Sequence, residues 1–414
     1  MRILFLSEFF EPEPMMKGLQ FARAFASRGH DVQVLTGFPN YPGGRLYPGY
    51  RITPYQSETM DEIVVHRVPL FPSHDRSAAR RIATYTSFAL SAAAIGPFKT
   101  FRPDVIYVYH SPATLGLPAA VLKVFTGARV ISDVLDLWPD TVVTSGMWNP
   151  RLLRAPLQWL CNAAYNTADA IVVPAPGLKR LLVERGFEPD RISVIYNWAH
   201  ATGDAGAVDR ELVRERLGWS GHFVVLFAGV MGVMQGLDTL LDAAALLKTA
   251  APQVRIALLG GGVETPRLAA RAAAEHLTNV SFHDRVPAGE VGRYLAAADA
   301  MVVHLKRDPL FEVMIPAKTQ GCMVAGRPLV MAVAGDAAAV VERARCGVTA
   351  EPSNPSSVAS AVERLARSSG AELEQMGRNA QAFYQREMSM ESGVPRFEAL
   401  FRGVRATEHA SVEP

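Results

Sequence analysis

Short runs of apolar residues alternate with longer helix-type segments along the whole chain. Continuous apolar stretches such as residues 105–109 are typical of strands buried on both faces of a sheet. Segments such as 17–28 and 152–168 have the length of helices. This alternation predicts right-handed strand–helix–strand crossovers and an open parallel sheet. The strands predicted in the first half cover residues 3–7, 31–36, 63–68, 105–109, 130–132, 170–173 and 192–195.

The same pattern begins again after residues 201–208, a stretch rich in glycine and alanine that is typical of a linker. Ligands of such sheets bind beyond the carboxyl ends of the strands. We therefore expect an α/β protein with two Rossmann-like, doubly wound domains that face each other across a cleft. Later strands are predicted at 223–228, 255–259, 280–282, 300–304 and 329–332. The predicted divisions are an N-terminal domain (1–200), a linker (201–220), a C-terminal domain (221–385) and a helix (386–405) that crosses back to the N-terminal domain.

Length and composition fit this organisation, since one hydrophobic core seldom organises 414 residues. The formal net charge of +2 argues against a nucleic-acid partner. Three isolated cysteines (Cys161, Cys322 and Cys346) lack metal-type spacing and predict reduced packing thiols. Ser7 and Glu8 end the apolar run at the N-terminus, which is typical of a first strand rather than a signal segment.

A glycine-bearing turn follows the predicted strand 223–228 and leads into a helix pattern. It contains Gly229, Gly232, Gln235 and Gly236. Backbone N–H groups and the helix dipole make such a turn an anion site, although a plain tight turn has the same pattern. A second turn with Gly260 and Gly261 follows the next strand. Either turn alone indicates no more than a phosphate site.

Lys318 lies just inside a predicted helix N-terminus, where the helix dipole disfavours a cation. An anionic partner such as a diphosphate explains this position, and a solvated lysine is the alternative. Thr319 and Gln320 follow it, and Glu312 precedes it.

With these elements in order, the chain resembles the retaining glycosyltransferase family 4, which has the GT-B fold. It is most similar to the bacterial branch that builds O-antigen, colanic acid and other surface polysaccharides. The resemblance covers residues 1–400. The stretches that carry it are 35–42, 136–140, 194–198, 229–236, 297–300 and 302–331.

The resemblance implies a UDP-sugar donor in the C-terminal domain, with the nucleotide base near residues 283–287. No separate cofactor is implied. The donor-binding residues carried over are Gly229, Gly232, Gln235, Gly236, Gly260, Gly261, Arg285, Val286, Glu312, Lys318, Thr319 and Gln320. Asp-x-Asp does not occur in the sequence, so we expect no metal site and a metal-independent reaction.

The chain departs from the family pattern in two places. Members carry an arginine and a lysine in the glycine turn, whereas Met231 and Gln235 stand in that region here. Members also carry two glutamates eight positions apart, where this chain has Val313 and Gly321. These departures shift neutralisation of the diphosphate onto Lys318, main-chain N–H groups and Lys306 or Arg307.

The N-terminal domain is expected to bind the acceptor. Asp136 follows a strand in a Leu-Trp-Pro context, and the family's catalytic residue lies beside it. His110 ends another strand, so Asp136 and His110 are both catalytic candidates, with turn capping and a loop hydrogen bond as their structural alternatives. The predicted acceptor-binding residues lie in the loops after the first two strands. They are Met16, Lys17, Gly18, Asn40 and Tyr41.

Arg76, Arg80 and Arg81 precede the uncharged segment 82–98. An apolar helix flanked by cations is typical of a membrane-interface helix, and a buried helix of the sheet is the alternative. The segment is short for a span and contains polar residues, so no transmembrane helix is expected. Relatives use undecaprenyl-diphosphate-linked sugars, which implies a cytoplasmic protein at the inner face of the plasma membrane.

The sequence thus predicts a retaining transferase that moves an N-acetylhexosamine or a deoxy-amino sugar from a UDP-sugar to a lipid-linked saccharide. Two alternatives remain open. One is a GT-B epimerase acting at C2 of UDP-N-acetylglucosamine, and the other is a non-catalytic nucleotide-sugar binder.

Overall fold

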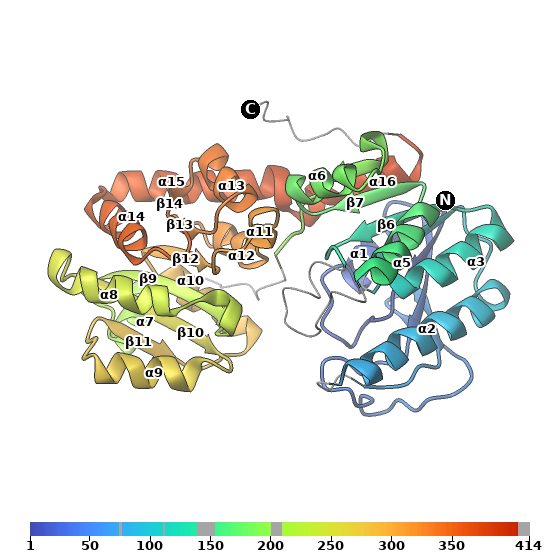
Figure 1. Ribbon diagram of the computed structural model, residues 1–414, viewed down its shortest axis with the longest axis horizontal. Coiled ribbons are helices and arrows are strands. Elements are labelled where there is room, and N and C mark those ends of the chain that lie inside the picture. The colour runs from blue at the N-terminus through green and yellow to red at the C-terminus, as the bar shows by residue number, and fades with distance from the viewer. Residues whose placement is uncertain (74–76, 111, 139–153, 200–208, 405–414) are drawn as a thin grey trace. The chain divides into compact units, whose positions relative to one another are not determined.

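The computed structural model describes residues 1–73, 77–110, 112–138, 154–199 and 209–404 (Figure 1). The chain divides into two compact units. The N-terminal unit comprises Met1–Pro174, Leu178–Ile195 and Gly393–Pro414, and the C-terminal unit comprises Ala175–Gly177 and Tyr196–Ser392. Each unit contains its own sheet with helices around it, so the predicted pair of α/β domains is confirmed.

An eight-stranded sheet with the order β3-β4-β2-β1-β5-β6-β7-β8 forms the N-terminal unit. Its strands are β1 (Arg2–Leu6), β2 (Asp31–Gly37), β3 (Gln56–Met60), β4 (Ile63–Val68), β5 (Val105–His110), β6 (Arg129–Val134), β7 (Ala170–Val173) and β8 (Ile192–Val194). All neighbours pair in parallel except β3 and β4. Strand β3 escapes the sequence prediction because its residues, QSETM, are mostly polar and lie at the edge of the sheet.

The helices of this part of the chain cover both faces of the sheet. They are α1 (Leu19–Ala26), α2 (Ala78–Lys99), η1 (Ala113–Leu115), α3 (Gly116–Thr126), α5 (Arg154–Thr167), α6 (Pro176–Glu184) and η2 (Pro189–Arg191). Phe5 of β1 contacts Phe21 of α1, whereas Leu35, in register with Leu6 on the opposite face, lies against Gly96 of α2. Side chains alternate between the faces of a strand, so α1 and α2 lie on opposite sides.

The final helix, α16 (Met390–Phe401), completes the N-terminal unit from the end of the chain. Phe397 packs edge-on against Phe21 and Tyr107, with ring centroids 5.2 and 5.7 Å apart. Glu398 accepts hydrogen bonds from Arg28 at 2.6 Å and pairs with His30. An aromatic cluster therefore joins β1, β5, α1 and α16.

The C-terminal unit has a six-stranded, fully parallel sheet with the order β11-β10-β9-β12-β13-β14. Its strands are β9 (Phe223–Val230), β10 (Val254–Gly261), β11 (Val280–His283), β12 (Ala300–His304), β13 (Leu329–Ala332) and β14 (Gly347–Thr349). Its helices are α7 (Arg210–Leu217), η3 (Val233–Gln235), α8 (Asp238–Ala250), α9 (Thr265–Ala274), α10 (Ala288–Ala297), α11 (Pro309–Glu312), α12 (Lys318–Val324), α13 (Asp336–Ala344), α14 (Pro355–Arg367), α15 (Gly370–Phe383) and η4 (Tyr384–Met388).

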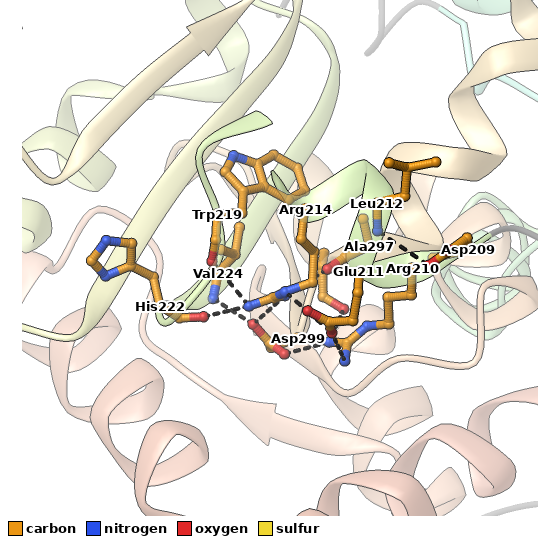
Figure 2. Close-up of polar contacts among 12 residues, drawn as sticks. Asp209, Arg210, Glu211, Leu212, Arg214, Trp219, His222, Val224, Ala297 and Asp299 are labelled. Atoms are coloured by element: carbon orange, nitrogen blue, oxygen red, sulfur yellow. Dashed lines mark hydrogen bonds and ion pairs between the residues drawn. The ribbon is translucent and has the colours of Figure 1, made fainter. Parts of the chain in front are cut away.

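Helix α7 lies within the stretch 201–220 that the sequence assigns to a linker. Figure 2 shows how it is attached to the sheet. Arg214 donates to Asp299 at 3.0 Å and to the carbonyl of His222 at 2.6 Å, and Val224 N–H donates to Asp299 at 2.8 Å. Asp299 thereby connects the amino ends of β9 and β12, at the edge of the sheet opposite the candidate site.

All three cysteines are buried and free, as their spacing predicts. Within the described part of the chain, no helix combines the length and the apolar character needed to cross a bilayer.

Candidate functional site

Each sheet has one place where the direction of strand order reverses. In the C-terminal unit this switch point lies between β9 and β12, and in the N-terminal unit it lies between β1 and β5. Loops that leave neighbouring strands in opposite directions create a crevice at such a point, where open α/β sheets bind ligands. The candidate residues are therefore those at the carboxyl ends of these four strands.

The predicted glycine turn occupies the C-terminal switch point. Gly229 has φ of +132° and Gly236 has φ of +57°, conformations that favour glycine. Gly232 N–H donates to Oε1 of Gln235 at 3.0 Å, which fixes the short helix η3. Met231 is fully buried, so it cannot present a polar group to a ligand. The turn therefore offers backbone groups and carries no cation of its own.

The second glycine turn packs against the first. A Cβ atom at Gly260 would lie 2.1 Å from the carbonyl oxygen of Gly229, and Met231 N–H donates to the carbonyl of Gly261 at 3.1 Å. The glycine at position 260 thus lets the backbones of the two turns approach each other closely. No Cβ contact constrains Gly261, whose substituent position is open.

Lys318, the first residue of α12, extends across the first glycine turn. Its Nζ lies 3.7 Å from the centroid of the Phe227 ring and 3.4 Å from the carbonyl oxygen of Val230. A Cβ at Gly229 would lie 2.7 Å from its Cε atom, so glycine provides the room for this side chain. Burial lowers the pKa of Lys318 to about 8. Among the described residues no carboxylate pairs with it, leaving its charge available to an anion.

His304 is a residue of this site that the sequence argument missed. It ends β12, and its Nδ1 lies 2.6 Å from the carbonyl oxygen of Gln235 while Ser353 N–H donates to its Nε2 at 3.3 Å. These contacts define a neutral imidazole, and burial lowers its pKa. His304 therefore braces the glycine turn. A histidine at the end of a buried strand was the available signal.

The other predicted donor residues of this region are placed by α11 and α12. Thr319 and Gln320 are buried, and the Gln320 amide nitrogen lies 3.1 Å from the carbonyl oxygen of Pro316 when its amide is oriented to donate. Thr319 Oγ1 has no hydrogen-bond partner among the described residues. Glu312 ends α11, with its carbonyl oxygen against Gly335. Gln320 thus holds the start of α12.

The region predicted for the nucleotide base follows β11. Arg285 is exposed and Val286 is half-buried. His283 packs edge-on against Trp219 at 5.5 Å and Tyr294 at 6.0 Å, and burial lowers its pKa. These aromatic contacts fix the strand end from which Arg285 and Val286 extend.

The two catalytic candidates lie at the carboxyl ends of adjacent strands in the N-terminal unit. His110 ends β5 and pairs in register with Val134 of β6, two residues before Asp136. The side chain of His110 lies outside the described part of the structure. Asp136 is half-buried, and its desolvation raises its pKa. The structure therefore places both backbone positions at one edge of the sheet.

Lys17 has a different environment from the one expected of an acceptor contact. Its side chain is fully buried, and Nζ donates to Asp133 Oδ2 at 2.5 Å. The same oxygen accepts a hydrogen bond from Tyr107 at 2.6 Å, and the ammonium lies 5.0 Å from the Phe397 ring centroid. Lys17 thus ties the loop after β1 to the sheet, and acceptor contact by its ammonium stays a prediction.

The remaining predicted acceptor residues are organised by two glutamates. Glu13 Oε1 accepts from the backbone N–H groups of Asn40 and Tyr41, each at 2.7 Å. Glu11 accepts from Leu19 N–H at 2.9 Å and occupies the space that a Cβ at Gly18 would need. Met16, which lies between Glu13 and Gly18 in the sequence, is half-buried. The loops after β1 and β2 are therefore held together by the buried carboxylate of Glu13, and Glu11 fixes the end of the first loop against α1.

Glu8 is the second residue that the sequence argument missed. It follows β1 at the N-terminal switch point and is 1% exposed. Neither carboxylate oxygen has a hydrogen-bond partner among the described residues. Burial, and then the nearby Glu13, raise the pKa of Glu8 well above its ordinary value. A carboxyl group directly after the first buried strand was the sequence signal.

Comparisons with known proteins match both units. Residues 19–198 match a family described as glycosyl transferase 4-like domain, and residues 222–368 match glycosyl transferases group 1. A D-rhamnosyltransferase, WbpZ of Pseudomonas aeruginosa, is 32% identical over 66% of this chain and 74% of its own length. A probable glycosyltransferase, WbjE of the same species, is 25% identical over 73% of this chain and 75% of its own length.

Among solved structures, the chain is similar to HepE from Anabaena in complex with UDP. The TM-score is 0.71 and the identity 16%, with 98% of this chain and all of that chain covered. This similarity confirms the GT-B fold predicted from the sequence.

Proposed function

Since this chain belongs to the GT-B glycosyltransferases of bacterial polysaccharide biosynthesis, we propose that it transfers a sugar from a UDP-sugar to a lipid-linked saccharide with retention of the anomeric configuration. The sugar proposed is an N-acetylhexosamine or a deoxy-amino sugar. The relative named as a D-rhamnosyltransferase adds a deoxyhexose to the donors to be tested.

The observation that carries this proposal is the position of Lys318. A half-buried ammonium group lies against a glycine turn at the switch point of the C-terminal sheet, with no carboxylate partner among the described residues. A diphosphate supplies the counter-charge that this site lacks, and the backbone N–H groups of the turn add hydrogen bonds. The solved relative with UDP supports the choice of a uridine nucleotide.

The proposed chemistry requires little from the protein beyond positioning and electrostatics. The bond between the anomeric carbon and the β-phosphate oxygen breaks as the acceptor oxygen bonds to the same carbon. The acceptor's proton passes to the leaving diphosphate, whose growing negative charge Lys318 stabilises. Asp136 or His110 orients the acceptor hydroxyl or stabilises positive charge on the sugar. We propose that no metal takes part, in keeping with the absence of Asp-x-Asp from the sequence.

The acceptor is proposed to bind the N-terminal unit near Met16, Gly18, Asn40 and Tyr41. A polyprenyl-diphosphate carrier remains in the membrane, so the enzyme is proposed to work at the inner face of the plasma membrane. The cations Arg80 and Arg81 in the first turn of α2 support this location, while Arg76 lies outside the described residues.

The proposal is tested by incubating the protein with a panel of UDP-sugars and a lipid-linked saccharide in detergent micelles. We expect UDP release that depends on the acceptor, an α-linked product from an α-linked donor, and an unchanged rate in the presence of EDTA. UDP release that does not depend on the lipid-linked saccharide would contradict transfer. A product with the inverted anomeric configuration would contradict retention.

The same panel separates the alternatives. Conversion of UDP-N-acetylglucosamine to its C2 epimer would identify an epimerase. Thermal stabilisation by a nucleotide sugar without product would identify a binding protein, because a ligand of the folded state raises stability whether or not it reacts.

A further inference from the structure

Three neighbouring helices of the N-terminal unit carry exposed apolar side chains on their outward faces. Helix α3 contacts both α2 and α5, so the three lie side by side (Figure 1). Along α2 the outward positions recur every three or four residues and include Ile82, Leu90 and Phe98, the last 74% exposed. An outward helix face in water normally carries polar residues. This face of α2 therefore lacks the composition of a water-exposed surface.

The apolar surface continues across the two other helices. Leu117, Val124 and Phe125 are exposed on α3, and Trp159 and Leu160 are exposed on α5, Trp159 to 72%. Phe98 and Phe125 contact each other edge-on, with ring centroids 6.0 Å apart. Contiguous exposed apolar surface of this extent indicates an interaction site.

A cavity opens within this surface. Its volume is about 300 Å³, at the lower end of the range for small-molecule pockets. It is lined by uncharged residues from all three helices, among them Thr86 and Leu90, Gly116 and Leu117, and Trp159 and Ala163. Such a lining suits a hydrocarbon and gives a polar ligand few partners.

The charges on these helices indicate which partner covers the surface. Helices α2, α3 and α5 contain no aspartate or glutamate, whereas they carry Arg80, Arg81, Lys99 and Lys123. Lys123 pairs with Asp169 beyond α5. A second copy of the chain would bring two such cationic surfaces together, which is unfavourable. An anionic lipid surface would instead neutralise them.

We propose that the face formed by α2, α3 and α5 lies in the interface of an anionic bilayer, and that its cavity takes one hydrocarbon chain of a lipid. This inference rests on the proposed membrane association and extends it from the cations of α2 to a three-helix surface with a chain-binding pocket. It does not depend on the donor sugar.

Flotation of the full-length protein with vesicles tests the surface. The vesicles contain phosphatidylcholine with or without phosphatidylglycerol. We expect binding that needs phosphatidylglycerol and that falls about tenfold or more in Leu90→Glu and in Leu117→Glu. Leu246→Glu, at a comparably exposed leucine on α8, is the matched control and should bind like the wild type. Equal binding by all four proteins would overturn the proposal.

The cavity has its own test. Ala163→Phe fills it while keeping the surface apolar, and we expect this variant to bind vesicles several-fold more weakly than the wild type. Lipids brominated along the chain should quench the fluorescence of Trp159, measured as the difference from Trp159→Phe, and quench it less in Ala163→Phe. Unchanged binding and quenching in Ala163→Phe would overturn the chain-binding pocket.

Two readouts separate this inference from the proposed function. UDP affinity, measured without vesicles, should be the same in wild type, Leu90→Glu and Ala163→Phe, because the donor residues lie in the other unit. Wild-type protein that transfers sugar in micelles but ignores anionic vesicles would overturn the inference alone. A change in oligomeric state with Leu90→Glu, without a change in vesicle binding, would assign the face to a second copy and overturn it too.

Discussion

The switch points of the two sheets occupy equivalent topological positions and are built from opposite chemistry. Between β9 and β12 the chain supplies a glycine backbone, a neutral His304 and the ammonium of Lys318. Beside β1 it supplies buried carboxyl groups: Glu8, which has no hydrogen-bond partner in the described part of the chain, and Glu13, which holds the neighbouring loops. One position suits an anion, and the other suits hydroxyl groups that donate hydrogen bonds.

The two units also differ in how a lysine near the candidate residues is paired. In the C-terminal unit, Lys318 has no carboxylate partner among the described residues and is available to a ligand. In the N-terminal unit, Lys17 is fully paired with Asp133. We propose that the half-buried Lys318 binds the donor, whereas the fully buried Lys17 has an architectural role. The following predictions test that contrast.

The largest expected effect is on the paired lysine. Lys17→Met leaves Asp133 buried without its counter-ion and should lower the free energy of unfolding by about 3–5 kcal/mol. Urea unfolding measures it, and the double variant Lys17→Met, Asp133→Leu should recover part of the loss. Lys123→Met, which breaks the partly exposed pair with Asp169, should cost about 1 kcal/mol or less. Equal losses in the two single variants would remove the architectural role of Lys17.

The unpaired lysine should matter to transfer more than to stability. Lys318→Ala is expected to lower the rate of acceptor-dependent UDP release about 100-fold or more, because the leaving diphosphate loses the cation proposed to stabilise it. Gln235→Ala removes a side chain that only accepts a hydrogen bond from Gly232, so its rate should fall much less. If the two variants lose activity alike, the donor site described above is incorrect.

The pH dependence of UDP binding sharpens the same point. Lys318 has a pKa of about 8, below its ordinary value of 10.5, so its charge is lost as pH rises through 8. UDP affinity should then fall by up to about tenfold per pH unit, and calorimetric titration from pH 7 to 10 would show it. The folded state binds fewer protons than the unfolded state between those two pKa values, so stability itself should rise over that interval. Lys318→Ala should show neither trend.

The smallest effect is expected at Glu8. Here stability should fall with rising pH, whereas at Lys318 it should rise. The pKa of Glu8 is raised above its ordinary value of 4.5, so the folded state retains a proton that the unfolded state has released. Glu8 therefore favours the folded state below pH 4.5, and this contribution is lost as pH rises towards the folded pKa. The fall in stability with rising pH should be absent from Glu8→Gln. Thermal unfolding of this variant and of the wild type at a series of pH values measures it. Parallel curves for the two proteins would argue that Glu8 is already ionised.

Much of the fold follows from local patterns, because buried parallel strands are continuous apolar runs. Strands β7, β12 and β13 have the bounds that their sequences predict. Strand β3 is polar, and β14 is only three residues long, so neither carries a periodic signal. Helix α7 falls in a stretch whose start resembles a linker, and long-range contacts of Arg214 with Asp299 attach it to the sheet.

The site was predictable in position and less so in the role of each side chain. Sequence identifies Lys318 and the glycine turn because strand, turn and helix follow one another along the chain. It cannot show that Gly260 makes room for Gly229, or that Lys17 meets Asp133, since those partners are far apart in sequence. Glu8 and His304 were not predicted for the same reason, because their burial depends on neighbouring strands that are distant in sequence.

The position of α16 has a consequence for how the protein is made. Phe397 completes an aromatic cluster with Phe21 and Tyr107, although nearly the whole chain separates them. During synthesis the main segment of the C-terminal unit, Tyr196–Ser392, is complete before α16 has left the ribosome, whereas the N-terminal unit, begun first, must wait for α16. A fragment ending at residue 195 should therefore expose the apolar surface that Phe397 covers, and we expect it to aggregate.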